Sequence, residues 1–418
     1  MRIKVDENGN WRSFRHRNFR ILFPANALSN IGTWAQRVAQ DWLVLELTDN
    51  NGFFLGLVTA IQFAPVLLFS LQGGAMADRI DKRKLLIWTN VVAALACYAL
   101  GILVVTEVVQ LWHVFICAAV LGISSALDAP IRQSFTAEIV GHSDVANAVS
   151  LNSANFNAGR LVGPALSGFL IARFDTGPSF LINATTYLFV ILALLFMRSS
   201  DFFIQKKEET LGTIREGLRY AQARPDLYVV MALVFFAATF GLNFQIFNAL
   251  MATKEFGKGP ASYGLLGTYI AIGSLSGALF SARLERFRNA KLVIKLGVWF
   301  SIVVIILSVA PTYTWYSLWL PICGISALTM LISANSYVQV NSDPAVRGRV
   351  MGIYLLVFMG GTPLGSMLIG YFTEAIGTRQ TIALCGGISL FMCVLIWFIF
   401  NDKVERPDDP RVSSVLKG

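Results

Sequence analysis

Residues 150–169 read SLNSANFNAGRLVGPALSGF. This stretch has the length that a helix needs to cross a membrane, about 20 residues, yet it carries amides, glycines and a full charge. At 100° per residue, Asn152, Gly159 and Gly163 share one face of such a helix. Arg160 lies on the adjoining face, and the remaining face is apolar. The stretch therefore predicts a membrane helix that lets a neighbouring helix approach closely at its glycines.

The glycine pattern of this stretch returns in the second half of the chain. An offset of 202 residues places 122–135 on 324–337 without a gap, and both segments begin Gly-Ile-Ser. At the same offset Gly159, Gly163 and Gly168 fall on Gly361, Gly365 and Gly370. These matches indicate an internal duplication. Two related halves with a substrate site between them near the membrane midplane are an architecture of secondary transporters.

Composition places the whole chain in the membrane. Hydrophobic residues make up 55% of the 418 and charged residues 14%, against roughly 25% charged in an ordinary soluble domain. Apolar windows of about 20 residues recur throughout, and breakers divide them into about twelve spans. We therefore expect an all-α polytopic protein built from two six-helix bundles. The expected divisions are an N-terminal segment (1–19), the first bundle (20–197), a linker with an amphipathic helix (198–226), the second bundle (227–400) and a tail (401–418).

The positions of lysine and arginine predict the orientation. With both ends in the cytoplasm, the outer loops hold only Arg173, Lys254, Lys258 and Arg379, and the other basic residues lie inside. The net charge of +9 follows from this bias. A nucleic-acid partner would need the basic residues on one soluble face, so we expect none. The N-terminus lacks the pattern of a cleaved signal peptide, and we expect the first span to direct insertion.

The sequence contains no motif for a disulfide framework, a metal site, nucleotide binding or hydrolysis. All five cysteines fall inside predicted spans without paired spacing, so we expect buried thiols and neither a disulfide framework nor a metal site. The three histidines are scattered, and the chain has no nucleotide-binding loop or hydrolase motif. We therefore expect no enzyme, no cofactor and no ATP-driven pump.

Two motifs resemble those of the major facilitator superfamily. Residues 74–84 read GAMADRIDKRK, similar to the loop signature of that superfamily, with Asp81 in place of its second glycine. The matching residues are Gly74, Asp78, Arg79, Lys82 and Arg83. The fifth span resembles the glycine-proline signature of superfamily exporters at Gly159, Gly163, Pro164 and Gly168. Over about residues 14–400 the chain is most similar to the branch containing enterobactin exporters and macrolide-efflux proteins.

The resemblance implies a function and a set of moving contacts. It implies a monomeric transporter in the bacterial cytoplasmic membrane that exports amphipathic small molecules of the drug or siderophore type by alternating access. Proton antiport is the implied energy source, although Ala118 stands where the superfamily has an arginine in its fourth span. The alternative is an importer or a lipid or lysolipid transporter of the same fold. Residues expected to pack between the two bundles are Gly159, Gly163, Pro164, Gly168, Gly361, Gly365 and Gly370.

The first span carries a polar stripe with a candidate proton carrier. Asn26, Asn30, Thr33, Arg37 and Asp41 recur every three or four residues and so share one helix face. Arg37 and Asp41 are four residues apart and can pair within the helix. Protonation of Asp41 would release Arg37, so this pair is the candidate for proton coupling. A static salt bridge is the alternative.

Further charges inside the spans predict a cavity and a gate. A charge at the middle of a span costs at least about 2.5–3.5 kcal/mol, so Arg160 should face a fixed partner or an anion in a central cavity. The resemblance to the superfamily implies that Asp128 latches an inner gate by pairing with Lys82, Arg83 or Arg132, and a role in substrate binding is the alternative. Asp78 is expected to face the start of span eleven. The central-cavity candidates are Asn26, Asn30, Asn152, Asn155, Arg160, Asn243 and Gln245. The gating candidates are Gly74, Asp78, Arg79, Lys82, Arg83, Asp128 and Arg132.

Overall fold

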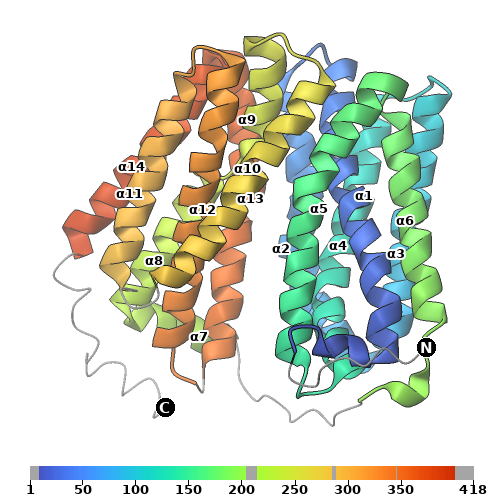
Figure 1. Ribbon diagram of the computed structural model, residues 1–418. Helices are drawn as coiled ribbons and strands as arrows, with labels where there is room; N and C mark the ends of the chain where they lie inside the picture. Colours follow the sequence, from blue (N-terminus) through green and yellow to red (C-terminus); the bar gives the residue numbers. More distant parts are fainter. Residues whose placement is uncertain (1–8, 204–213, 285–288, 345, 401–418) are drawn as a thin grey trace. The chain divides into compact units, whose positions relative to one another are not determined.

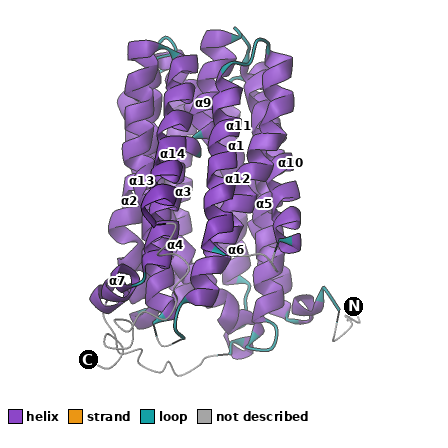
Figure 2. Ribbon diagram, turned by 90° about the vertical axis from the view of Figure 1, so that its left-hand side faces the viewer, coloured by secondary structure: helices purple, strands orange, loops and turns teal. Residues whose placement is uncertain are grey.

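The structure is a computed structural model that describes residues 9–203, 214–284, 289–344 and 346–400. The side chains of residues 70–79, 214–217 and 400 lie outside this description. Within the described residues the chain consists of helices joined by short loops, without a strand (Figure 2).

The first half of the chain supplies six long helices among the described residues (Figure 1). They are α1 (Arg17–Leu47), α2 (Gly52–Arg79), α3 (Lys82–Val105), α4 (Leu111–Val140), α5 (Val145–Phe174) and α6 (Gly177–Leu195). Two short 3₁₀ helices flank them, η1 (Arg12–Arg15) and η2 (Ser199–Asp201).

The second half begins with the short helix α7 (Ile214–Ala223), which falls within the segment expected to be amphipathic. The next span is interrupted: α8 (Pro225–Phe236) and α9 (Phe244–Leu250) are each followed by a π-helix, η3 (Ala237–Gly241) and η4 (Met251–Glu255). The helices that follow are α10 (Pro260–Arg283), α11 (Ala290–Ser308), α12 (Tyr313–Asn341), α13 (Arg347–Ile376) and α14 (Thr378–Phe400).

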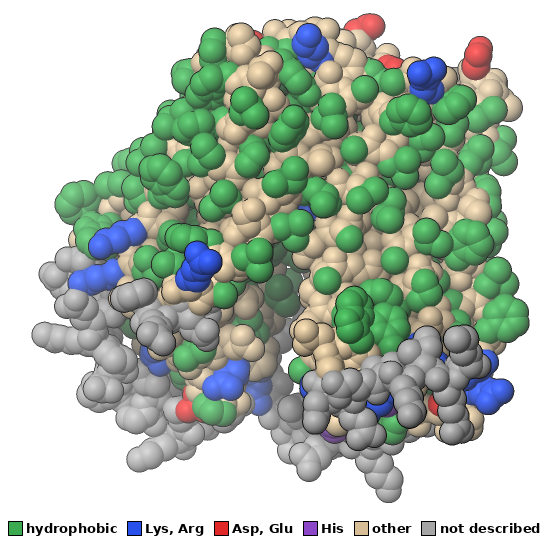
Figure 3. All heavy atoms as spheres, in the orientation of Figure 1, with side chains coloured by type: hydrophobic (Ala, Val, Ile, Leu, Met, Phe, Trp, Pro, Cys, Tyr) green, Lys and Arg blue, Asp and Glu red, His purple; other side chains and the backbone are tan. Residues whose placement is uncertain are grey.

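Ten helical segments of the described chain are long and apolar enough to cross a membrane. The segment Pro225–Glu255, with its two π-helices, is one of them. Helices α1 and α5 are as long, at 31 and 30 residues, but carry the polar residues noted above through their length. In Figure 3 hydrophobic side chains cover the flanks of the helices, while the visible lysines and arginines lie mostly towards the helix ends. All five cysteines are buried free thiols, as the sequence predicts.

Contacts between Cα atoms divide the chain into two compact units. The first comprises Met1–Asn50, Ile61–Glu208 and Lys258–Thr268, and the second comprises Asn51–Ala60, Glu209–Gly257 and Tyr269–Gly418. The division passes through α2 and α10, so each unit contains a short helical segment from the other half of the sequence.

Glycines set the packing inside each unit. The polypeptide of α1 lies so close to α5 that an added Cβ at Gly163 would meet the Trp34 side chain at 2.6 Å, and one at Gly159 would meet Asn30 at 2.8 Å. Small residues allow membrane helices to pack this closely, and such packing stabilises their association because the hydrophobic effect does not drive helices together within lipid. The repeat reproduces it, since Gly361 and Gly365 face Thr239 in η3.

These contacts correct one expectation from the sequence. Gly159, Gly163, Gly361 and Gly365 were expected to pack between the two bundles, but each pair packs on the first long segment of its own half. By contrast, Pro164 and Gly168 contact Gly264 of α10 within the first unit. Gly370 contacts the start of α2 at Gly52 and Phe53 within the second unit. The duplicated pattern therefore serves two different packing roles.

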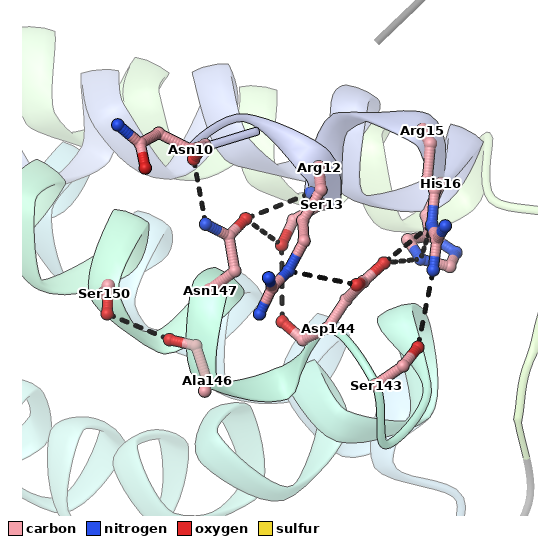
Figure 4. Close-up of polar contacts among 10 residues, drawn as sticks. All are labelled: Asn10, Arg12, Ser13, Arg15, His16, Ser143, Asp144, Ala146, Asn147 and Ser150. Carbon is pink, nitrogen blue, oxygen red and sulfur yellow. Dashed lines mark hydrogen bonds and ion pairs between the residues drawn. The ribbon is translucent and has the colours of Figure 1, made fainter. Parts of the chain in front are cut away.

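The start of α5 is tied to the N-terminal segment by a charged cluster (Figure 4). Asp144 is 1% exposed, and its carboxylate lies 3.3 Å from Arg12 Nε, 2.8 Å from Arg15 Nε and 2.7 Å from His16 Nε2. Burial acts to raise the pKa of Asp144, but the bond to His16 and the charge of Arg15 outweigh it and lower that pKa. Ser13 donates its backbone N–H and its hydroxyl to Asn147 Oδ1, at 3.1 and 2.6 Å.

Candidate functional site

A buried carboxylate on α1 is hydrogen-bonded by a tyrosine from the second half of the sequence. Asp41 is 2% exposed, and its Oδ2 accepts a hydrogen bond of 2.7 Å from Tyr263 Oη. Tyr263 lies in the first turn of α10 and is equally buried. The ring of Trp42 stacks on it, with centroids 6.3 Å apart and planes 24° from parallel. All three residues belong to the first unit.

Close helix packing brings Tyr263 to this place. Gly264 approaches the backbone of α5 so nearly that an added Cβ would meet the Pro164 carbonyl oxygen and the Gly168 backbone. Farther along α10, Thr268 Oγ1 donates to the Leu161 carbonyl oxygen at 3.0 Å. The first turns of α10 are therefore fixed against α5, beside α1 and its carboxylate.

The predicted ion pair between Arg37 and Asp41 is not formed. Among the described residues, Arg37 makes neither an ion pair nor a hydrogen bond, and its Nε is buried without a partner. Its guanidinium instead lies over the ring of Trp34, 4.9 Å from the centroid, and 5.5 Å from that of Phe63. Trp34 is three residues before Arg37, so the i,i+3 stacking position competes with the i,i+4 carboxylate and prevails.

Arg160 approaches the same tryptophan from α5. Its Cζ lies 5.8 Å from the centroid of Trp34, and within the described part of the chain it too has neither a hydrogen bond nor an ion pair. Gly163, one turn along α5, makes this approach possible because it leaves room for the Trp34 side chain. We refer to Trp34, Arg37 and Arg160 as the arginine–tryptophan cluster.

Asp128 forms the pair that the sequence offered within its own helix. Arg132 donates two hydrogen bonds to its carboxylate, from Nε to Oδ2 at 2.7 Å and from Nη2 to Oδ1 at 2.9 Å. Thr89 and Asn90 of α3 also donate to Asp128, each at 3.1 Å. Arg132 further donates to Asn26 Oδ1, which connects α4 to α1.

The other two candidate partners of Asp128 lie elsewhere. Lys82 Nζ pairs with Glu138 at 2.6 Å, and Arg83 donates to the carbonyl oxygens of Leu194 and Leu195. The expected Lys82 and Arg83 alternatives for the latch are therefore wrong for this structure. Gly74, Asp78 and Arg79 are in the last turns of α2, whose side chains lie outside the described part of the chain.

The amides predicted to line a cavity hold neighbouring elements instead of meeting one another. Asn155 donates to the Phe23 carbonyl oxygen and Asn152 to Thr136 Oγ1, both at 3.4 Å. Asn30 packs against Gly159. In the second unit, Asn243 donates to the Thr239 carbonyl oxygen at 2.8 Å, and Gln245 is half-buried.

Three features near the candidate residues could not be found from the periodicity of the sequence. Tyr263 is one, because its partner Asp41 is remote in the chain. Glu374 is another: its Oε1 accepts bonds of 2.5 Å from both the Gly52 backbone N–H and Lys254 Nζ, all within the second unit. The third is the pair of π-helices in the Pro225–Glu255 span, a local form that is frequent at functional sites.

Comparison with known proteins decides the family. The model of a family described as "transmembrane secretion effector" matches residues 8–413, nearly the whole chain. The chain belongs to that family of major facilitator superfamily transporters. It is therefore a transport protein with several membrane-spanning helices, of the bacterial inner membrane.

Curated relatives of the chain are exporters and transporters of small molecules. A "Staphyloferrin A transporter" of Staphylococcus aureus (strain NCTC 8325 / PS 47) is 23% identical, over 92% of this chain and 97% of that protein. The "Multidrug efflux pump Tap" of Mycolicibacterium fortuitum is 26% identical, over 86% and 90%. The "Enterobactin exporter EntS" of Shigella boydii serotype 4 (strain Sb227) is 21% identical, over 96% of each.

Solved structures share the fold. A bacterial homologue of the human lysosomal transporter Spinster, in an inward-facing and unoccupied conformation, aligns with a TM-score of 0.76 at 15% identity. The alignment covers 94% of this chain and 99% of that one. A peptide transporter of the POT family in complex with sulfate aligns with a TM-score of 0.75 at 13% identity, over 96% and 97%. These similarities establish the major facilitator fold.

Proposed function

We propose that the protein is a secondary active transporter that exports amphipathic small molecules, of the drug or siderophore type, in exchange for protons by alternating access. The observation that carries the coupling proposal is the buried carboxylate of Asp41 with its hydrogen bond from Tyr263. The family and its curated relatives support export.

The bond between Asp41 and Tyr263 depends on protonation. An ionised carboxylate accepts a charge-assisted hydrogen bond, roughly twice as strong as a bond between neutral groups. When Asp41 takes up a proton, this bond weakens and the attachment of α10 to α1 loosens. Because α10 comes from the second half of the sequence, uptake of a proton would then favour a rearrangement of that half relative to the first. Loss of the proton would restore the bond and reset the transporter.

Other contacts have roles in this proposal. The pair of Asp128 and Arg132, connected to Asn26, is proposed as the inner gate latch. Gly168 and Gly370 are among the positions at which a helix from one half of the sequence touches a helix from the other half, and we propose these two glycines as sliding contacts. Residues 20–197 and 227–400 would form the two bundles, with α1 and α5 completing twelve spans and both termini in the cytoplasm.

The test is transport by purified protein in liposomes under an imposed pH gradient. Three dansyl dyes of different charge serve as probes: dansylcadaverine (cationic), dansyl-glutamine amide (neutral) and dansyl-glutamate (anionic). The proposal predicts concentrative transport of at least one dye against its own gradient, abolished by a protonophore. Transport of a dye that ignores the pH gradient would overturn proton coupling. Failure to transport any of the three would count against an exporter of amphipathic molecules.

A further inference from the structure

We propose that the arginine–tryptophan cluster binds the negatively charged end of the transported molecule, so that the substrates are amphipathic organic anions, carboxylates first. This inference rests on the proposed export function and specifies its substrate class. It assigns a binding role to Trp34, Arg37 and Arg160. This role depends on the contact between α1 and α5, because neither helix alone brings the three residues together.

The charges around the cluster do not balance. Two guanidinium groups share one indole ring, and the charge of Arg37 acts repulsively on Arg160. The acid that acts on Arg37 is Asp41, without an ion pair between them, and Asp41 already accepts the bond from Tyr263. The hydroxyl of Tyr187 on α6 also acts on Arg37, but it is neutral at ordinary pH and lies 3.5 Å from Thr33 Oγ1. The cluster thus keeps an excess of positive charge.

The two guanidinium groups also have N–H donors without acceptors in the described part of the chain. A guanidinium carries five N–H donors in a planar fork that matches a carboxylate. In the described part of the chain, neither Arg37 nor Arg160 donates to another residue, and the Nε of Arg37 is buried without an acceptor. Buried donors without partners are rare in folded proteins. A carboxylate placed at the two guanidinium groups would supply both the charge and the acceptors that the protein does not.

The aromatic surroundings explain how the cluster keeps its form before a ligand arrives. Trp34 orients both guanidinium groups over its ring, while Phe63 borders Arg37 and Phe156 meets Trp34 edge to face at 5.7 Å. A guanidinium held over an aromatic ring can still donate its N–H groups to an acceptor. The same rings offer an apolar contact to the rest of an amphipathic molecule. A cation would meet repulsion here, so the cluster also selects against positively charged molecules.

The test is equilibrium binding of the three dansyl dyes to purified protein in nanodiscs, followed by dansyl fluorescence and without any gradient. The wild type should bind dansyl-glutamate at least about tenfold more tightly than its neutral amide and more tightly still than dansylcadaverine. Arg37→Gln and Arg160→Gln should each weaken dansyl-glutamate binding about tenfold or more while leaving the neutral dye nearly unchanged. Arg173→Gln, in the last turn of the same helix α5, is the matched control and should keep the preference.

Each result decides the proposal. Removing a charge from the helix bundle should not unfold it, and the melting temperature of each variant verifies this. Equal binding of the three dyes by the wild type, no binding of dansyl-glutamate, or an unchanged preference in both arginine variants would overturn the anion site. Gradient-driven export of dansylcadaverine with no binding of the anion would sink this inference alone and leave the export function standing. Anion binding without any gradient-driven transport would leave the anion site standing and would count against the export function.

Discussion

Replacing Gly163 with alanine tests whether close contact between α5 and α1 builds the arginine–tryptophan cluster. The new Cβ would lie 2.6 Å from Trp34 Cβ and 2.8 Å from the Ile31 carbonyl oxygen. Non-bonded carbon atoms prefer about 3.5–4.0 Å, so the two helices must separate by about 1 Å or Trp34 must leave its position. Forcing an extra group into a packed interior costs about 1–3 kcal/mol.

The matched control is Gly352→Ala in α13. Gly352 is also helical, but an added Cβ there meets nothing within 4 Å. Both variants gain the same helix propensity, about 1 kcal/mol in favour of alanine, so this contribution cancels when they are compared. We therefore predict that Gly163→Ala is less stable than Gly352→Ala by about 1–3 kcal/mol.

Two measurements read out this prediction. Unfolding by SDS titration of the purified variants gives the difference in apparent free energy, and dansyl-glutamate binding reports the cluster. Gly163→Ala should lose affinity for the anionic dye, because the shift of α1 or of Trp34 separates the members of the arginine–tryptophan cluster, whereas Gly352→Ala should bind like the wild type. If the two variants proved equally stable and equally good binders, the packing role assigned to Gly163 would be refuted.

The remaining predictions concern the two charged networks of the first unit. A double-mutant cycle on Asp128→Asn and Arg132→Gln should show an interaction energy of about 0.5–3 kcal/mol in the free energy of unfolding, because these two residues pair. The effects of Asp128→Asn and Lys82→Ala should be additive, because Lys82 pairs elsewhere. Coupling of Asp128 to Lys82 and not to Arg132 would contradict the observed pairing. Asp144→Asn should lower the melting temperature at pH 7. Because the pKa of Asp144 is lowered in the folded protein, its stabilisation is fully present above the unfolded value of about 3.9 and is lost as the pH falls through the folded value. Melting curves of both proteins should therefore converge only below about pH 4, and a difference that vanished near pH 6 would rule out this carboxylate as the cause.

Much of the fold follows from local sequence. Apolar runs of membrane length predict the long helices because a helix in lipid must satisfy its own backbone. The repeat of Gly159 at Gly361 predicts equivalent close packing in both halves, and the structure has it. The repeat does not specify which helix packs on these glycines, because a glycine indicates only that some helix can approach closely. That is why the expectation of packing between the bundles is wrong for Gly159 and Gly361.

The polar contacts were predictable only where both partners lie on one helix. Asp128 and Arg132 are four residues apart and do pair, but Arg37 and Asp41 have the same spacing and do not. The difference is tertiary: Tyr263, 222 residues away, bonds to Asp41, and Trp34 holds Arg37. The cluster with Arg160 likewise needs the contact between α1 and α5, which periodicity in either helix does not contain.

The central claim is that Asp41 couples proton movement to transport, and one comparison tests it most directly. Asp41→Asn and wild-type protein are reconstituted in liposomes and assayed for dansyl-glutamate movement in two ways, as exchange between equal pools without a gradient and as uphill transport driven by a pH gradient. Glu107→Gln, at an exposed position in the loop after α3, is the control. The proposal predicts that Asp41→Asn keeps exchange but loses uphill transport, while Glu107→Gln keeps both. Uphill transport by Asp41→Asn at the wild-type rate, still abolished by a protonophore, would contradict the assignment of the coupling proton to Asp41.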